Sequence, residues 1–268
     1  GFYEILDQVV SNYETEKNKL MEKLQEVCSL LFQRQNLLVS VTGGREGYAA
    51  LRNMSDQITD GLYADTEKES IEISLPDQKN EGFKDASQIQ YVSLAGNYAQ
   101  SGFSYHGAMR VFKVIMNYEY LWQNIRVKGG AYGCSTNVGR NGDVCFLSYR
   151  DPNLERTLEV YRGVTDYLKE FELDERGMTR FVIGAFSELD APLTPMSQGR
   201  RSLLSYLTGV SYEMIQKERE QALHTCPQDI RNLAETMQAV LDHSYICAIG
   251  NEGKLQEEAD LFDVLKTL

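Results

Sequence analysis

The chain has 268 residues, of which 42% are hydrophobic and 25% are charged, and its formal net charge is −12. This length is enough for one large globular domain, or for a domain with an appendage, with a sizeable core. The excess of acidic residues argues against nucleic acid as a partner and mildly favours basic ligands. No apolar run approaches the roughly 20 residues needed to cross a bilayer, so we expect no membrane partner.

Cysteine usage indicates a reducing compartment. The five cysteines form an odd set without a C-x-x-C spacing, which predicts neither a disulfide framework nor a zinc knuckle. We therefore expect buried free thiols and a cytoplasmic protein, although Cys134 and Cys145 flank a predicted hairpin and could be bridged across it. The N-terminus lacks the basic and apolar regions of a signal peptide. Because the chain begins with Gly1 and not with Met, we expect it to be part of a longer polypeptide.

The first part of the chain predicts two helices, a strand and a surface connection. Apolar residues recur every three, four or seven positions over residues 2–33, the pattern of an amphipathic helix with a charged outer face. The run NLLVSVTGG (36–44) predicts a short buried strand, and the segment behind it predicts a helix to about Leu62. Residues 64–87 are polar, contain Pro76 and show no period, so they predict a surface connection.

The middle of the chain predicts a strand, a long helix and a hairpin. Residues 88–98 alternate in the manner of a strand. Ser104 is the predicted N-cap of a helix that ends at Lys128, with Gly129 behind it in a left-handed conformation. The segments AYGCSTNV and DVCFLSYR are joined through GRNG, which is a good signal for a hairpin turn.

The rest of the chain predicts mainly helices. Asp151 is a predicted N-cap, followed by Pro152 at the first helical position. The helical pattern continues over residues 174–242, with a break at APLTP (191–195), because two prolines must end or kink a helix. Residues 243–252 predict a strand, and the last residues predict a short helix. Hairpins, a block of successive helices and a returning strand together predict an α+β fold.

Several common catalytic motifs are absent from the sequence. His106, His224 and His243 are the only imidazoles, and none has the H-E-x-x-H or H-x-x-E-H spacing of a zinc site. We expect His106 to cap its helix or to lie at the surface. The glycine pairs match neither a dinucleotide fingerprint nor a phosphate loop, and no G-x-S-x-G nucleophile elbow is present. The sequence therefore predicts no metal site and no hydrolase triad within this chain.

The stretch IRVKGGAYGCS places Arg126 and Tyr132 six residues apart around two glycines. One interpretation is structural, with Arg126 stabilising the last turn of a helix and Tyr132 serving as a strand aromatic. The other is functional, with both side chains at one end of the sheet, where they could donate hydrogen bonds to a carbonyl or an oxyanion. Spacing alone favours the structural interpretation, because such residues are common at these positions.

The longer run LWQNIRVKGGAYGCSTNVGRNGDVCFLSYRDPNLERTLEVY resembles the insulinase or pitrilysin-type zinc metallopeptidases, and above all their presequence protease and falcilysin branch. The similarity continues through SELDAPLTPMSQG to the closing strand. It implies a metallopeptidase-like α+β domain over residues 36–268, with a mainly antiparallel sheet and helices packed on one face. Residues 1–35 would then be a lead-in helix from the preceding domain.

The resemblance also implies a function. In this family two halves enclose a peptide chamber, zinc is bound in the first half, and this chain resembles the last domain of the second half. Arg126, Tyr132 and Gly130 would then bind the substrate backbone, with Arg126 and Tyr132 also assisting cleavage. The implied partners are the N-terminal catalytic half of the same polypeptide and unstructured peptides. Two alternatives stay open: a non-catalytic partner or binding subunit of a two-subunit peptidase, and a scaffold domain in which both side chains are structural.

Overall fold

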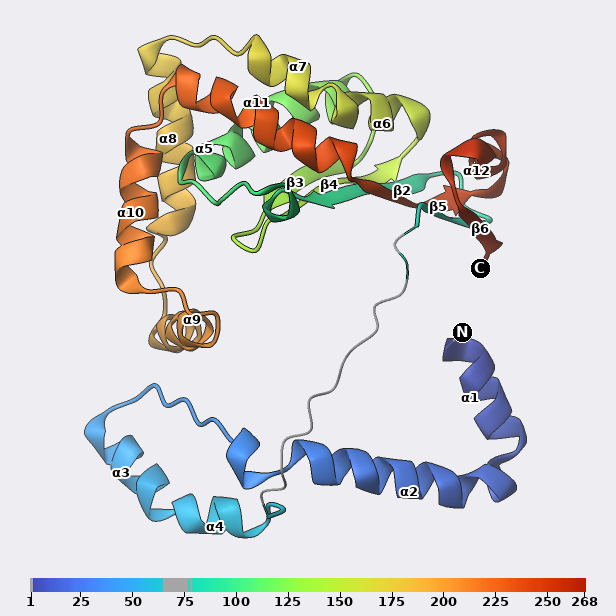
Figure 1. Ribbon diagram of the computed structural model, residues 1–268, viewed down its shortest axis with the longest axis vertical. Helices are drawn as coiled ribbons and strands as arrows, with labels where there is room; N and C mark the ends of the chain where they lie inside the picture. The colour runs from blue at the N-terminus through green and yellow to red at the C-terminus, as the bar shows by residue number, and fades with distance from the viewer. Residues whose placement is uncertain (1, 65–76, 78) are drawn as a thin grey trace. The chain divides into compact units, whose positions relative to one another are not determined.

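The computed structural model describes residues 2–64, 77 and 79–268, and within it the chain divides into two compact units (Figure 1). The N-terminal unit comprises Gly1–Ser74 and Leu193–Thr208, and the sheet unit comprises Leu75–Pro192 and Gly209–Leu268. The predicted domain boundary falls after residue 35, but residues 36–74 belong to the same compact unit as the helices before residue 35. The boundary itself stays a prediction, because these units reflect contacts within this chain and not the domain limits of a whole protein.

The N-terminal unit contains helices joined by irregular chain. They are α1 (Phe2–Ser11), α2 (Tyr13–Leu31), the 3₁₀ turn η1 (Arg34–Asn36), α3 (Arg45–Asn53), α4 (Ser55–Asp60) and α9 (Pro195–Leu207). The strand predicted over residues 36–44 is wrong, since residues 37–42 form no strand and are exposed. In the described part of this unit, a bridge between Gln33 and Tyr63 is the one β pairing, so the apolar run has no neighbouring strand to hydrogen-bond with.

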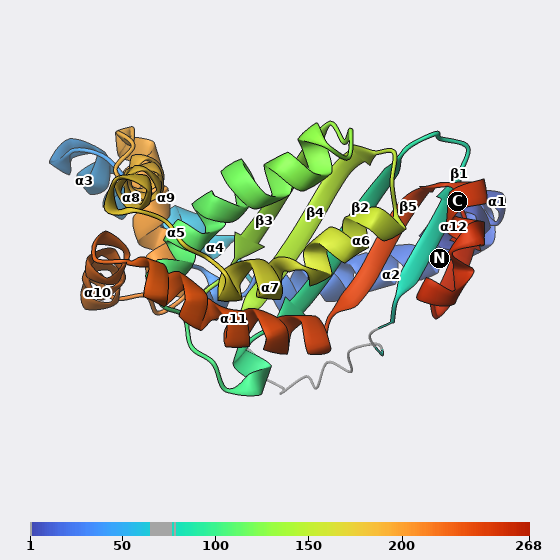
Figure 2. The ribbon, with the colours of Figure 1, turned by 90° about the horizontal axis from the view of Figure 1, so that it is seen from above.

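The sheet unit is built on six strands in the order β3-β4-β2-β5-β1-β6 (Figure 2). They are β1 (Glu81–Asp85), β2 (Gln90–Asn97), β3 (Gly133–Val138), β4 (Asp143–Asp151), β5 (Tyr245–Asn251) and β6 (Val264–Thr267). The pairs β3–β4, β4–β2 and β2–β5 are antiparallel, whereas β5–β1 and β1–β6 are parallel. The predicted strand over residues 88–98 and the predicted hairpin are confirmed as β2 and as β3–β4.

Helices lie along one face of this sheet. Figures 1 and 2 show α5, α6, α7 and α11 on that face. The helices and turns of the unit are η2 (Ala99–Ser101), α5 (Ala108–Ile115), η3 (Met116–Tyr120), η4 (Trp122–Val127), α6 (Glu155–Arg162), α7 (Val164–Lys169), α8 (Glu175–Leu189), α10 (Tyr212–Leu223), α11 (Pro227–Asp242), α12 (Glu252–Glu257) and η5 (Ala259–Leu261). The core lies between these layers and includes Val92, Leu94, Phe112, Phe146 and Leu158. The predicted α+β fold, mainly antiparallel with helices on one face, is confirmed.

Two strands lie where the sequence predicted none. β1 falls in the predicted surface connection, the remainder of which includes residues 65–76 and 78 outside the described part of the chain. β6 follows α12, where only a short helix was predicted. Gly82 of β1 lies close to Leu265 and Phe262, so this strand is held by residues far away in the sequence. A short strand whose pairing depends on such distant partners shows little of the sequence alternation from which a strand is predicted.

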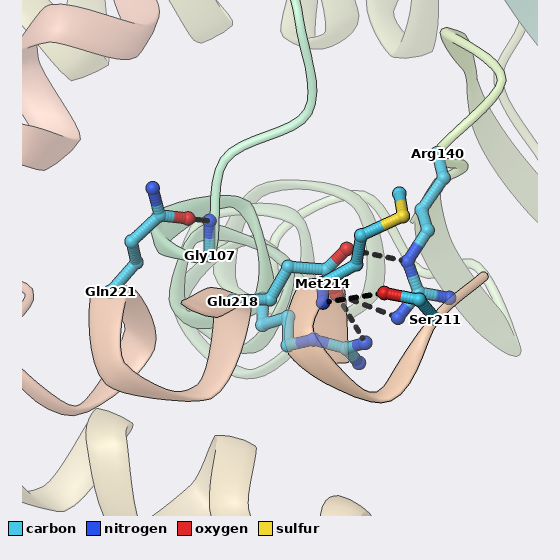
Figure 3. A network of polar contacts seen from close by, with 7 residues as sticks. Gly107, Arg140, Ser211, Met214, Glu218 and Gln221 are labelled. Atoms are coloured by element: carbon cyan, nitrogen blue, oxygen red, sulfur yellow. Dashed lines mark hydrogen bonds and ion pairs between the residues drawn. The ribbon is translucent and has the colours of Figure 1, made fainter. Parts of the chain in front are cut away.

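The long central helix begins later than predicted. It starts at Ala108, so Ser104 is not its N-cap. The N–H of Ala108 donates to Nδ1 of His106 over 3.2 Å. Figure 3 shows a second bond, in which Oε1 of Gln221 accepts the N–H of Gly107 over 2.9 Å. Of the two roles predicted for His106, capping or a surface position, this bond to Ala108 supports the first, although Gly107 is the N-cap residue, and a neighbouring helix supplies the other acceptor.

A nearly buried carboxylate ties α10 to the rest of the sheet unit (Figure 3). Glu218, only 7% exposed, accepts two hydrogen bonds from Arg140 in the β3–β4 turn, of 2.7 Å from Nε and 2.6 Å from Nη2. Arg110 on α5 adds a third contact of 3.3 Å. This paired geometry fixes the turn against two helices.

Replacing Glu218 by Gln is expected to lower the free energy of unfolding by about 2 kcal/mol, because two partly buried guanidinium groups lose their counter-charge. Asp190→Asn is the matched control, since Asp190 pairs with Arg219 in an exposed setting and should cost about 0.5 kcal/mol or less. Urea denaturation of both variants measures the difference. Equal small losses would show that the Glu218 cluster stabilises no more than a surface ion pair.

Candidate functional site

The turn between the central helix and β3 is wider than an ordinary helix end. Its last segments, η3 and η4, are π-helical. The N–H of Gly130 donates to Arg126 O over 3.0 Å, and that of Ala131 donates to Ile125 O over 3.1 Å. This pattern resembles a Schellman motif widened by one residue, as a π-helical turn requires. Gly130, with φ +82°, is the left-handed residue, so the prediction that Gly129 takes this role is wrong.

The structure places Arg126 and Tyr132 side by side. Nη1 of Arg126 donates to the backbone carbonyl of Tyr132 over 2.6 Å. The guanidinium carbon lies 4.3 Å from the ring centre of Trp122 and 5.6 Å from that of Tyr132. Only Nη1 of the guanidinium makes a hydrogen bond to the described residues, so other N–H groups are available to a ligand. The arginine thus closes the turn and still offers donors.

Tyr132 presents its phenol to solvent. Its backbone N–H donates to Tyr149 O over 3.1 Å and to Arg150 O over 3.3 Å, which attaches the residue to β4. Its ring meets the ring of Tyr149 edge-on, with centres 5.8 Å apart. The side chain is 65% exposed, and its hydroxyl makes no hydrogen bond to any described residue. The hydroxyl is therefore available as a donor.

A β-bulge in β4 lies next to this pair. Gln90 faces Asp151 and Val92 faces Ser148, so the two residues Tyr149 and Arg150 lie opposite a single residue of β2. Arg150 has φ +50°, which costs a non-glycine residue of the order of 1 kcal/mol or more. Both bulged residues are exposed. Bulges of this kind occur often beside functional sites, where they redirect side chains.

The open face of the sheet carries an apolar groove of about 620 Å³ that reaches this pair. Arg126 and Tyr132 lie at one end of it, and Tyr91, Leu147 and Ile249 are among the other lining residues. No sequence pattern singled out Tyr91, Tyr149 or Leu147, because they meet only through strand pairing. Their alternation with buried neighbours along β2 and β4 was the available signal, and it identifies a face but no site.

The segment Asp151-Pro152-Asn153 stabilises the turn between the central helix and β3 through hydrogen bonds. The side-chain amide of Asn153 donates to Gly129 O over 2.6 Å. The buried carboxylate of Asp151 accepts from the N–H of Asn153 over 2.9 Å and from the Thr157 hydroxyl over 2.7 Å. The prediction that Asp151 is a helix N-cap is therefore wrong, since α6 begins only at Glu155. Asp151 instead holds the loop on which the glycines rest.

In the described part of the chain, histidines and cysteines form no second site. Among the described residues, no three His, Cys, Asp or Glu side chains are grouped so that they could hold a metal ion. All five cysteines are free, but the expectation that they are buried is wrong, since Cys226 is exposed and the other four are only partly buried. Cys134 faces Ser148 and Cys145 faces Asn137 in the β3–β4 register, so the bridge considered for them does not form. Burial raises the pKa of the Cys134 thiol to about 11, which keeps it protonated and unreactive at neutral pH.

Comparison with solved structures identifies the fold. A protease from Helicobacter pylori matches with a TM-score of 0.52 at 13% identity, covering 75% of this chain and 52% of that one. An inactive domain of an M16 peptidase from Pseudomonas fluorescens matches with a TM-score of 0.51 at 14% identity, covering 76% and 51%. At these identities the likeness shows the fold alone, an M16 peptidase-like α+β domain.

Sequence comparison names the family. The model of the PreP C-terminal domain matches residues 80–252, and the chain belongs to this family. Protein HypA of Clostridium perfringens is 37% identical over 256 residues, 95% of this chain and 26% of that protein. Presequence protease 1, chloroplastic/mitochondrial, of Arabidopsis thaliana is 28% identical over 278 residues, 100% of this chain and 25% of that protein. The resemblance to presequence proteases is thus confirmed, and the chain spans about a quarter of these relatives' length.

No described helix is both long enough and apolar enough to span a membrane.

Proposed function

We propose that this chain is the substrate-contacting C-terminal domain of a zinc metalloendopeptidase that degrades unstructured peptides. The observation that carries the proposal is the pairing of Arg126 and Tyr132 at the end of an apolar groove. The guanidinium carbon of Arg126 lies 5.6 Å from the ring centre of Tyr132, and both side chains have hydrogen-bond donors that bond to no described residue. Arg126 would hold a substrate carbonyl, and Tyr132 would donate to the backbone or to the developing oxyanion. Gly130, exposed and without a Cβ, lets the peptide backbone approach.

The rest of the proposal concerns groups outside this chain. The described residues offer no ligand set, so we place the zinc ligands in an N-terminal catalytic half of the same polypeptide, which is the partner of this domain. The relatives' greater length supports this arrangement. The alternative, a non-catalytic binding subunit, predicts no upstream zinc site. A cytoplasmic location, inferred from the free thiols, is part of the proposal, whereas the Arabidopsis relative is named as chloroplastic and mitochondrial.

The proposal predicts that chain 1–268 alone binds no stoichiometric zinc and cleaves no peptide, whereas the complete protein does both. Metal analysis and a fluorogenic assay with an unstructured peptide, run on both proteins after circular dichroism has established that each is folded, make the comparison. One tightly bound zinc and turnover in chain 1–268 would contradict the division of labour. An inactive, zinc-free complete protein would favour the binding-subunit alternative.

A further inference from the structure

Three tyrosines form a row across the open face of the sheet. The rings of Tyr132 and Tyr149 have centres 5.8 Å apart, those of Tyr149 and Tyr91 are 5.3 Å apart, and both contacts are edge-to-face. Ile249 lies next to Tyr91 in the β2–β5 register. In the neighbouring row Leu147, 42% exposed, faces Ser93 on β2. Together these side chains give the groove an apolar floor that spans β4, β2 and β5, with Tyr132 at its end.

The bulge in β4 adds a charged side chain beside this row. Because side chains alternate along a strand and Ser148 faces Val92, Tyr149 lies on the open face opposite Tyr91 in any case, whereas without the extra residue Arg150 would point to the other face. With the extra residue, Arg150 is exposed as well, and its guanidinium carbon lies 5.8 Å from the ring centre of Tyr149. The left-handed backbone of Arg150 is the cost of this arrangement. A costly local conformation that adds a cation to a row of exposed aromatic rings points to a binding function.

The charges around the groove restrict what can bind in it. Among the described residues, its lining contains one cation, Arg126, and no Asp, Glu or Lys. The second cation, Arg150, lies against Tyr149 at the same end. A carbonyl oxygen is attracted to these guanidinium groups, whereas a lysine or arginine side chain would be repelled and would find no carboxylate partner. The groove therefore suits an uncharged apolar group with a carbonyl beside it.

The free edge of the sheet is not available to a peptide in the same region. On the edge strand β3, Oδ1 of Asn117 accepts the outward N–H of Thr136 over 2.6 Å. Nδ2 of Asn117 donates to the C=O of Thr136 over 3.3 Å. Arg126 donates a hydrogen bond to the backbone carbonyl of Tyr132, the residue just before this strand. A peptide could add to β3 as a further strand only by breaking these bonds. Recognition on the face of the sheet, through side chains, is the remaining mode.

We propose that the groove formed by Tyr91, Leu147, Tyr149 and Ile249 is a specificity subsite for one large apolar side chain, aromatic or long aliphatic, of the bound peptide. This subsite rests on the proposed function, because the carbonyl next to that side chain is the one that Arg126 holds. A groove of about 620 Å³ accommodates such a side chain with part of its flanking backbone, within the usual size range of ligand sites.

The test uses the complete protein and measures peptide binding, with divalent metal chelated so that no peptide is cleaved. The probes are fluorescent unstructured peptides in which a single Phe, Lys or Gly is moved along an otherwise constant sequence, and fluorescence anisotropy gives the Kd. At one position of the scan we expect Phe to bind roughly tenfold more tightly than Gly, and Lys to bind more weakly than Gly. Equal affinities at every position would overturn the subsite.

A charge placed in the groove sharpens the test. Leu147→Glu should weaken binding of the Phe peptide roughly tenfold and make Lys the preferred residue at that position. Ala95→Glu is the matched control, because Ala95 is exposed on the same face of β2 but does not line the groove, and its order of affinities should be that of the wild type. Tyr91→Ala should lose the Phe preference without gaining one for Lys.

The outcomes separate the subsite from the proposed function. If Arg126→Lys weakens binding while Leu147→Glu leaves the order Phe, Gly, Lys unchanged, the subsite is wrong and the proposed backbone contact stands. If Leu147→Glu reverses the preference while Arg126→Lys changes neither binding nor turnover, the subsite stands and the proposed role of Arg126 is wrong. Circular dichroism and the melting temperature of each variant establish that its fold is intact.

Discussion

Replacing Arg126 by Lys in the complete protein is expected to lower kcat/KM for an unstructured peptide on the order of 100-fold. Lysine keeps the positive charge but lacks the planar guanidinium, whose several N–H groups can donate to the Tyr132 carbonyl and to a ligand carbonyl at the same time. It also loses the flat contact with Trp122, 4.3 Å away, that fixes the direction of the guanidinium. The remaining ammonium group would hold the substrate carbonyl with poorer geometry, so transition-state stabilisation suffers most.

Arg219→Lys is the matched control for this substitution. Arg219 also combines a 2.7 Å bond, to Asp190, with a ring contact, to Phe186 at 5.1 Å, but it lies on α10 outside the groove. Both variants should lose about 1 kcal/mol of stability or less, and only Arg126→Lys should lose turnover. Similar kcat/KM values for the two variants would mean that Arg126 serves the helix end alone.

Parts of the fold followed from local pattern. The buried stripe Leu158, Tyr161, Val164 and Leu168 was visible as a helical repeat, and it lies in the core over a break at Gly163. The strands β1 and β6 were missed because their partners are far along the chain, so nothing in their own residues showed the pairing. The apolar run over residues 37–42 was wrongly predicted as a strand, because it has the composition of a strand but no neighbouring strand to pair with among the described residues.

The candidate site was only partly accessible from the sequence. Arg126 and Tyr132 stand in one short motif, and a single turn brings them together. The motif did not reveal that a π-helical end shifts the left-handed position from Gly129 to Gly130. Tyr91 and Tyr149 meet across two strands that are distant in sequence, and a bulge places Arg150 beside them. A bulge depends on strand pairing, which no local pattern specifies.

The second large effect is expected from Tyr132→Phe, which removes only a hydroxyl. Because this hydroxyl has no hydrogen-bond partner among the described residues and the ring is 65% exposed, the substitution should leave the edge contact with Tyr149 and the melting temperature unchanged. If the phenol donates to the developing oxyanion, its loss should lower kcat/KM on the order of 100- to 1000-fold, by analogy with the removal of oxyanion-hole donors.

Turnover of Tyr132→Phe in the complete protein, set against its melting temperature, is the most direct test of the proposed site. Tyr245→Phe serves as the control, since Tyr245 is exposed on the open face of β5 but lies outside the apolar groove. We predict wild-type melting temperatures for both variants, wild-type kcat/KM for Tyr245→Phe, and a loss of at least about 100-fold for Tyr132→Phe. Wild-type turnover in Tyr132→Phe would contradict a catalytic role for this tyrosine and leave it a strand aromatic.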